Sequence, residues 1–205
     1  PAMTEKSYYE RYWEKNLGAY DKGVAQLPPD WQQGDLDRIL SFCRSEIQGC
    51  VLDAGCGDGF FTKILAGQDR TQDVTGIDIS SKAIELARAK NPDLNFYQGE
   101  LNQIPLEGNR YDLVSMVEVI EHLVDVDGVL DEVARVLKPG GLFLVTTTDF
   151  NWLKSVLIAA FYFERYFYPT NPHVRFFTKN TLSQVLINHG LSVVKYSWNG
   201  SYLGI

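Results

Sequence analysis

Cysteine is scarce in this sequence, and the few cysteines form no metal-binding or disulfide pattern. The 205 residues include three, Cys43, Cys50 and Cys56, and no CxxC pair. This usage is typical of a reducing compartment, so we expect a cytoplasmic protein. The first residues also lack a charged segment followed by an apolar core, and a signal peptide is therefore not expected.

Positive charge and long apolar runs are scarce as well. Lys and Arg number 19 against 26 Asp and Glu, a net charge of -7, which leaves no basic excess for the phosphates of a nucleic acid. We therefore expect no nucleic-acid partner. A membrane-spanning helix needs roughly twenty apolar residues. The nearest run covers only residues 155–163, between Lys154 and Glu164, and predicts a surface or capping helix.

From residue 50 onward, short apolar runs alternate with helical segments. This alternation predicts an α/β fold, a Rossmann-like, doubly wound and mostly parallel sheet with helices on both faces. The length of the chain fits one such domain. Strands are predicted at residues 50–54, 73–78, 95–98, 111–117, 142–147 and 191–198, and helices at 60–66, 82–90, 126–137 and after Thr178.

Two aromatic segments fall outside this alternation. We expect residues 1–46 to form an N-terminal helical cap, and residues 47–205 to form the main domain with a lid insertion at about 150–177. Aromatic residues at helical spacing are often ordinary core. Residues 152–168, however, are apolar on nearly all sides, so they must be buried or lie against lipid. We predict an apolar acceptor beneath both segments and peripheral membrane contact through 152–168. The predicted acceptor-binding residues are Tyr8, Tyr12, Trp13, Trp152 and Phe161.

A glycine-rich turn follows the first predicted strand, in VLDAGCGDGFF at residues 51–61. Glycine lets the backbone approach a ligand closely, and doubly wound sheets bind ligands at this end of their strands. A dinucleotide site requires GxGxxG, but Phe60 stands where the third glycine belongs. The carboxylates of Asp53 and Asp58 would repel a pyrophosphate and attract an ammonium group. The turn therefore indicates a cationic or zwitterionic ligand, with a ligand-free tight turn as the alternative.

Two further acids stand at the ends of the next predicted strands. Asp78 ends the second strand, in GIDIS, where a carboxylate can accept hydrogen bonds from both hydroxyls of a ribose. Glu100 follows the third strand, in QGEL, where it can accept one from an exocyclic amine. A nucleoside with an amino-acid tail would satisfy these acids and those of the glycine turn together.

With these motifs the sequence resembles the class I S-adenosylmethionine-dependent methyltransferases. The resemblance covers about residues 47–198 and rests on VLDAGCGDG, GIDIS, QGEL, YDLVSMVEVIEHL and LKPGGLFLVTT in that order. It implies a seven-stranded sheet that ends in an antiparallel hairpin. Only the strand at 191–198 is evident, so the last strand is missing or the sheet ends differently. The donor-binding residues implied are Asp53, Gly55, Cys56, Gly57, Asp78, Ile79, Glu100, Leu101, Met116 and Val117.

The resemblance also implies what several of these residues do. The glycine turn would hold the methionine part of the donor, and Asp78 would hold the ribose. Ile79 and Leu101 would cover the two faces of the adenine. Met116 and Val117 would both line the sulfonium pocket at the end of the fourth strand.

The segment MVEVIEHL, at residues 116–123, gathers two carboxylates and an imidazole. Glu118, Glu121 and His122 stand in an i, i+3, i+4 relation, so in a helical turn their side chains would face one way. Neighbouring carboxylates repel each other unless a proton or a cation lies between them. One hypothesis is therefore a divalent ion, magnesium or manganese, that acidifies a hydroxyl. The other is that His122, with Glu121, acts as a general base without a metal.

A second, narrower resemblance bears on this choice. EVIEH with the later HVRFFT is similar to the metal-dependent O-methyltransferases of ubiquinone biosynthesis and of RNA 2′-hydroxyls. It implies Glu118, Glu121, His122 and His173 as metal ligands. Methyltransferases of glycan and natural-product pathways have a similar Glu-His pair without this set. Zinc is not expected because no cysteine cluster is present, and the RNA enzymes fit poorly with an acidic chain.

The sequence therefore predicts an S-adenosylmethionine-dependent enzyme that methylates a hydroxyl of a small acceptor. The acceptor is expected to be apolar, lipid-linked or a natural product, and His122 and Glu121 are the predicted catalytic residues. N- or C-methylation and a non-catalytic S-adenosylmethionine-binding protein remain as alternatives. The missing GxGxxG spacing disfavours a nicotinamide-dependent oxidoreductase. The remaining histidine, His189, ends a predicted helix and is expected to be structural.

Overall fold

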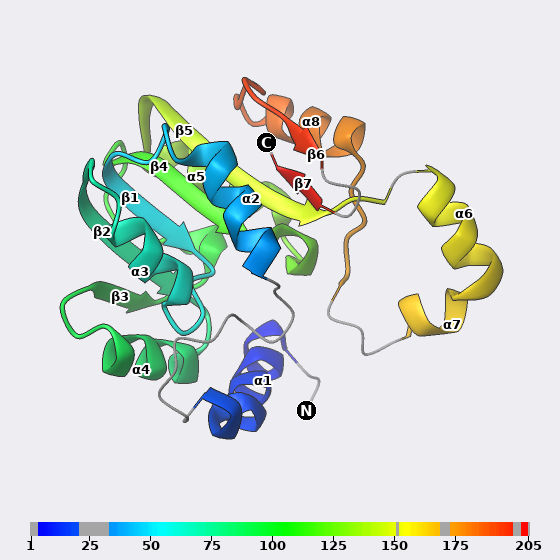
Figure 1. Cartoon of the computed structure of the whole chain (residues 1–205), viewed down its shortest axis with the longest axis horizontal. Helices are drawn as coiled ribbons and strands as arrows, with labels where there is room; N and C mark the ends of the chain where they lie inside the picture. The colour runs from blue at the N-terminus through cyan, green and yellow to red at the C-terminus, as the bar shows by residue number, and fades with distance from the viewer. Residues whose placement is uncertain (1–3, 21–32, 151, 169–172, 199–201, 205) are drawn as a thin grey trace.

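The computed structural model describes residues 4–20, 33–150, 152–168, 173–198 and 202–204. Its centre is a sheet with the strand order β3-β2-β1-β4-β5-β7-β6 (Figure 1). The predicted α/β fold with a mostly parallel sheet is confirmed. The five parallel strands are β1 (Gly49–Ala54), β2 (Thr71–Asp78), β3 (Asn95–Gln98), β4 (Tyr111–Val117) and β5 (Leu137–Thr148).

The pairing of β1 fixes where a ligand can bind. β1 pairs with β2 on one side and with β4 on the other, so the chain leaves β1 and β4 in opposite directions along the sheet. In doubly wound sheets a crevice opens at the carboxyl ends of the strands at such a point. The glycine turn after β1 and the MVEVIEHL segment at the end of β4 both lie there.

The edge of the sheet beyond β5 differs from the prediction. A short strand β7 (Tyr202–Gly204) pairs antiparallel with β5, and β6 (Ser197–Trp198) pairs antiparallel with β7. The strand predicted at 191–198 is thus only its last two residues, and a further short strand is present, where the prediction had left open a missing last strand or a different end of the sheet. Leu191, Val193 and Tyr196 pack against the core without joining the ladder, and this packing explains their apolar pattern.

Helices cover both faces of the sheet. Leu52 and Val114 face a core shared with α5 and α8, whereas their neighbours Val51 and Leu113 face a second core shared with α2 and α3. This division follows from the alternation of side chains along a strand, and each fully buried Leu or Val contributes about 1.5–3 kcal/mol. The helices are α2 (Gln33–Cys43), α3 (Phe60–Ala66), α4 (Ser81–Lys90), α5 (Val126–Val136) and α8 (Lys179–Asn188).

The first helix, α1 (Glu5–Tyr20), is fastened to α4. The Glu10 carboxylate accepts hydrogen bonds from Ser80 Oγ at 3.1 Å and from the backbone N–H groups of Ser81 and Lys82 at 2.8 and 3.3 Å. The first turn of a helix has N–H groups without helical partners and carries partial positive charge. Glu10 therefore caps α4 and holds α1 across the end of the sheet.

Two helices follow β5 and stand apart from the sheet (Figure 1): α6 (Trp152–Phe161) and α7 (Phe163–Tyr166). The Phe176 ring lies 4.7 Å from that of Phe150 and 5.2 Å from that of Phe167, measured between centroids. These contacts tie both helices to the segment that precedes α8. Among the described residues, no helix combines the length and the apolar character that crossing a membrane requires.

Candidate active site

A cavity of about 990 Å³ opens at the carboxyl ends of the parallel strands. Its wall combines the glycine turn, the end of β2, the 3₁₀ helices η1 (Leu101–Gln103) and η2 (Ile120–His122), part of α1, and His173. Ligand pockets extend to about 1,000 Å³, so this cavity has room for a nucleoside-sized ligand and a second molecule.

The glycine turn depends on glycine at two positions. Gly55 and Gly57 have φ angles of 82° and 53°, in the left-handed region that favours glycine. A Cβ atom on Gly55 would lie 2.5 Å from Val119 Cγ2, and one on Gly57 would lie 2.8 Å from the Trp13 ring. The turn is therefore packed directly against the segment after β4 and against α1.

Two buried carboxylates anchor this turn. Asp53 accepts hydrogen bonds from Thr62 Oγ1 at 2.6 Å and from Ser115 Oγ at 2.9 Å. Asp78 accepts them from the Gly57 N–H at 3.0 Å and the Ser80 N–H at 2.9 Å. Burial raises the pKa of Asp53 to about 6, against the effect of its two hydroxyl donors, and also raises the pKa of Asp78 to about 6. A cationic or hydroxyl-rich ligand would favour their charged forms.

Most of the predicted donor-binding residues border the same cavity. Besides the turn and the two acids, its lining includes Cys56, Ile79, Glu100, Leu101 and Val117. The prediction was wrong for Met116, which was expected to line the sulfonium pocket. Its side chain is 0 % exposed and belongs to the core beneath α5. Successive side chains of a strand point to opposite faces, so Met116 and Val117 do not line one pocket together.

The segment after β4 does not form the helical turn expected from Glu118. The 3₁₀ helix η2 covers only Ile120–His122, and Glu118 has a left-handed φ of 54°. The Glu118 N–H donates to the Thr146 carbonyl, and Thr146 Oγ1 donates to Glu118 Oε1 at 2.7 Å. Glu118 lines the same cavity as Glu121 and His122, but it is not part of the cluster of possible metal ligands.

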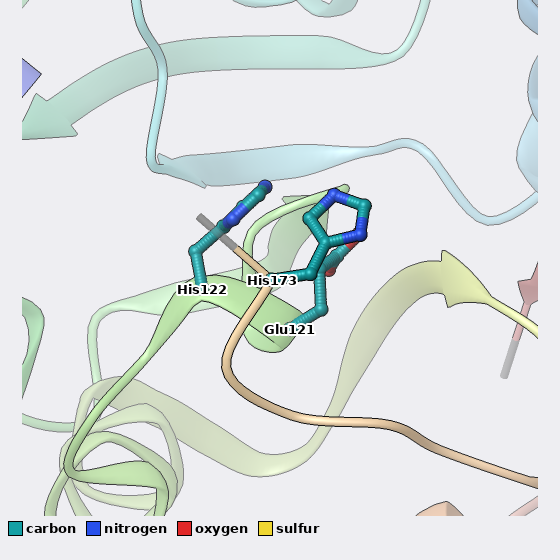
Figure 2. Close-up of side chains that lie close together, drawn as sticks. All are labelled: Glu121, His122 and His173. Carbon is teal, nitrogen blue, oxygen red and sulfur yellow. The ribbon is translucent and has the colours of Figure 1, made fainter. Parts of the chain in front are cut away.

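Glu121 and His122 instead meet His173, which lies 51 positions after His122 in the chain. Ligand atoms of these three side chains all lie within 4.8 Å of one another, and the two imidazole centroids are 4.7 Å apart. Figure 2 shows the three side chains gathered on one side of η2. The N–H groups of Val174 and Arg175 both donate to the Glu121 carbonyl at 3.0 Å, which fixes His173 beside η2. We call these three residues the acceptor cluster.

The Glu121 carboxylate is the most buried member of the acceptor cluster. Its residue is 2 % exposed, burial raises its pKa, and its Oε2 atom has no hydrogen-bond partner among the described residues. A buried carboxylate oxygen without a partner is costly. Together with two imidazoles at this spacing, it supplies donor atoms that could hold a divalent ion.

Aromatic side chains of α1 form the opposite wall. Tyr8, Tyr12 and Trp13, the residues of α1 predicted to bind the acceptor, line the cavity, and so does Tyr9, whose ring meets that of His122 edge-on at 6.1 Å. Burial strongly raises the pKa of Tyr9, so its hydroxyl stays protonated and can donate a hydrogen bond. α1 therefore places apolar aromatic rings, some of them with a hydroxyl group, beside the acceptor cluster.

Trp152 and Phe161 do not take part in this wall. Their residues are 76 % and 75 % exposed, and neither lines the cavity. The prediction placed them over the acceptor because the whole insertion is aromatic, but α6 turns away from the sheet after β5. Among the described residues of the insertion at about 150–177, His173 alone lines the cavity.

Two acids of α1 were absent from the predicted site. Glu5 lines the cavity, and its pKa is raised by burial and then by the nearby charge of Glu100. Glu10 holds α1 in place through α4. No local pattern links either residue to the later motifs, because the contacts depend on how α1 packs.

Comparison with known proteins agrees with this arrangement. Residues 52–145 match the family described as "Methyltransferase domain". A Mycolicibacterium smegmatis protein named "Probable S-adenosylmethionine-dependent methyltransferase" is 39 % identical over 99 residues, 48 % of this chain and 38 % of that protein. The ubiquinone biosynthesis O-methyltransferase of Thiobacillus denitrificans is 36 % identical over 115 residues, 53 % of this chain and 48 % of that protein. The chain thus spans less than half the length of either relative.

A solved structure shows the same fold over almost the whole chain. Phosphoethanolamine N-methyltransferase 2 of Haemonchus contortus, in complex with phosphomonomethylethanolamine and S-adenosylhomocysteine, has a TM-score of 0.71 and 18 % identity, and the match covers 96 % of this chain and 46 % of that one. Identity this low supports the fold alone. With the family match over residues 52–145 and the motifs gathered around one cavity, the chain is similar to the class I S-adenosylmethionine-dependent methyltransferases.

Proposed function

We propose that this chain transfers the methyl group of S-adenosylmethionine to a hydroxyl oxygen of a small, apolar acceptor. The observation that carries the proposal is that one cavity joins the glycine turn and Asp78 to the acceptor cluster. Methyl transfer from a sulfonium is an in-line displacement, so it requires a donor and a nucleophile held close, aligned and shielded from water.

The donor side supplies binding and orientation. The two glycines let the methionine part lie against backbone, and Asp78 can accept hydrogen bonds from the ribose hydroxyls with the lone pairs not used by its own N–H donors. Ile79 and Leu101 flank the position of the adenine. Val117 faces the cavity from the end of β4 and would border the sulfonium.

The acceptor cluster can take up the proton that the acceptor hydroxyl loses. A hydroxyl becomes a better nucleophile as its proton leaves, and a neutral imidazole is suited to accept that proton near neutral pH. In this version of the proposal His122 is the base, and the adjacent Glu121 carboxylate stabilises the imidazolium that forms.

A divalent ion is the second version of the same chemistry, and the residues fit one. The acceptor cluster offers two imidazoles and the unpartnered Glu121 Oε2. Imidazole ligands suit manganese better than magnesium, which prefers oxygen ligands. When bound, such an ion would lower the pKa of an acceptor hydroxyl. His122 would then be a ligand, and Glu118, which accepts a hydrogen bond from Thr146 Oγ1, would help to hold the segment in place.

The aromatic wall of α1 favours an apolar acceptor. Tyr8, Tyr9 and Tyr12 lie along the cavity, and aromatic rings bury large apolar area while a hydroxyl tip can still make a hydrogen bond. We propose that α1 and the end of the insertion around His173 together enclose the acceptor, as a lid would. A small molecule fits such an enclosed space better than a macromolecule does.

Labelled methyl transfer tests this function. Purified protein would be incubated with methyl-labelled S-adenosylmethionine and a panel of apolar molecules that carry a hydroxyl, an amine or neither. We expect transfer to hydroxyls, and a fall in kcat of about 10²–10⁴ in H122A with unchanged affinity for S-adenosylhomocysteine. The matched control H189A should keep wild-type kcat, because His189 lies outside the cavity. Transfer to amines alone, or donor binding without any transfer, would contradict the proposal.

Chelation separates the two versions. If an ion is bound, EDTA should abolish transfer, and added manganese should restore it more effectively than magnesium. If His122 acts alone as the base, EDTA should leave the rate unchanged.

A further inference from the structure

Exposed apolar side chains are concentrated on α6 and α7 and the residues next to them. Of the fifteen exposed large hydrophobic side chains among the described residues, nine belong to residues 152–168, although this segment is less than a tenth of the 205-residue chain. Trp152, Phe161 and Phe163 are 76 %, 75 % and 58 % exposed. Soluble surfaces rarely concentrate large apolar side chains in this way unless something covers them.

The two helices are anchored on their inner side only. Ile158 of α6 is 4 % exposed, and Ser155 Oγ donates to the Phe150 carbonyl at 3.1 Å. Phe167, after α7, packs on Phe176. These contacts fix the segment on the body of the protein and leave the other sides of α6 uncovered, in agreement with its position apart from the sheet (Figure 1).

Charge distinguishes between the molecules that could cover this surface. Residues 152–168 contain two basic residues, Lys154 and Arg165, and one acid, Glu164, a net charge of +1 in a chain of net charge -7. The rest of the chain therefore carries a net charge of -8. Two copies meeting through this surface would gain no attraction between opposite charges. An anionic lipid bilayer offers an apolar interior beneath a negative surface, and so matches both properties.

We propose that residues 152–168 form a membrane-docking surface that lies in the headgroup region of an anionic bilayer. Trp and Tyr are suited to this depth because their rings are apolar while their N–H and O–H groups reach water. The attachment is interfacial, because no described helix is suited to cross a membrane. It goes beyond the proposed transfer reaction and does not depend on it, since none of Trp152, Phe161 and Phe163 lines the cavity.

Vesicle co-sedimentation of the full chain tests this surface. We expect binding to vesicles of an equimolar mixture of phosphatidylcholine and phosphatidylglycerol, weaker binding to pure phosphatidylcholine, and loss of the difference at high salt. The double variant W152S/F161S should bind the mixed vesicles about tenfold or more weakly. The matched control V194S removes a side chain of similar exposure, 79 %, outside the surface and should bind like the wild type.

Circular dichroism of both variants confirms that they are folded before the comparison is made. Failure of the wild type to bind either kind of vesicle would overturn the proposal, and so would mixed-vesicle binding that W152S/F161S leaves unchanged. Sedimentation equilibrium adds an independent outcome: self-association that W152S/F161S abolishes, without vesicle binding, would assign the surface to a second copy of the chain.

Discussion

The donor side and the acceptor side of the cavity are built in different ways. The donor side consists of turns that directly follow β1, β2 and β3, so each of its residues is positioned by the strand before it. The acceptor side combines α1, η2 and His173, which are far apart in the sequence and meet only through tertiary contacts. The positions of the donor-side residues therefore follow from the sheet itself. The positions of the acceptor-side residues depend on how separate segments pack against the sheet.

The largest expected effect comes from the residue where the two sides touch. In G55A, the new Cβ meets Val119 of the segment after β4, and the left-handed backbone is strained by about 1–3 kcal/mol. We expect the affinity for S-adenosylhomocysteine, measured by calorimetry, to fall about a hundredfold, equivalent to about 3 kcal/mol.

The control for that variant is G140A. Gly140 has a φ of 77° and open space around its Cβ position, so the substitution adds strain without a clash, far from the cavity. G140A should lose stability but keep donor affinity. Equal donor affinity in G55A and the wild type would show that the two sides are not packed together as described.

Acid should weaken the donor side next. The pKa values of Asp53 and Asp78 are about 6 in the ligand-free chain, and their charged forms are the ones that attract the ammonium and accept ribose hydroxyls. Below that value both groups become protonated. Lowering the pH from about 7.5 to about 5 should therefore reduce affinity for S-adenosylhomocysteine about tenfold or more. An affinity for S-adenosylhomocysteine that rises or stays level as the pH falls would contradict the role given to the charged forms of Asp53 and Asp78.

A smaller effect should follow from loosening α1. The variant E10Q removes the charge that caps α4, and an N-cap interaction of this kind contributes about 0.5–2 kcal/mol. We expect donor affinity to fall about three- to tenfold, because α1 closes the cavity through Trp13. The exposed residue Glu14 on the same helix provides the control variant E14Q, which should bind the donor like the wild type.

The smallest expected effect concerns His189, which belongs to neither the donor side nor the acceptor side of the cavity. His189 Nδ1 lies 2.7 Å from Asp131 Oδ1, and its Nε2 lies 3.1 Å from Asp127 Oδ1. The Asp131 partner first, and then Asp127, raises the pKa of His189. Its stabilising contribution is therefore complete below the unfolded pKa of about 6.5 and is lost as the pH rises through the folded value.

In H189Q we therefore expect Tm to fall by a few degrees at about pH 6 and by much less at about pH 9, with unchanged donor affinity. Thermal unfolding at both pH values measures this difference. A loss of Tm that is larger at the higher pH would contradict the assignment of the two Asp partners.

The same comparison explains how much of the molecule could be predicted from the sequence. The five parallel strands, and the acids that stand at their ends, were predictable because periodicity and strand ends are local features. Met116 was misplaced because the alternation along β4 was not applied to two neighbouring residues. His173 was predictable only through a resemblance, since two backbone hydrogen bonds to the Glu121 carbonyl bring it to η2.

Other parts of the acceptor side were beyond local reasoning. Nothing near Glu10 indicates that it caps a helix starting 71 residues later. The aromatic composition of residues 152–168 predicts apolar surroundings but not which way α6 turns after β5, and so Trp152 and Phe161 were assigned to the acceptor. The domain boundary expected at residue 46 stays a prediction.

The central claim is that donor and acceptor cluster meet in one cavity. The most direct measurement is anomalous diffraction from crystals that contain S-adenosylhomocysteine and manganese. We predict density for the donor with its ribose at Asp78 and its sulfur beside Val117, and, if the metal version holds, a manganese peak bounded by Glu121, His122 and His173. A fully occupied donor without any manganese peak would leave His122 as the base, whereas donor density outside this cavity would contradict the account.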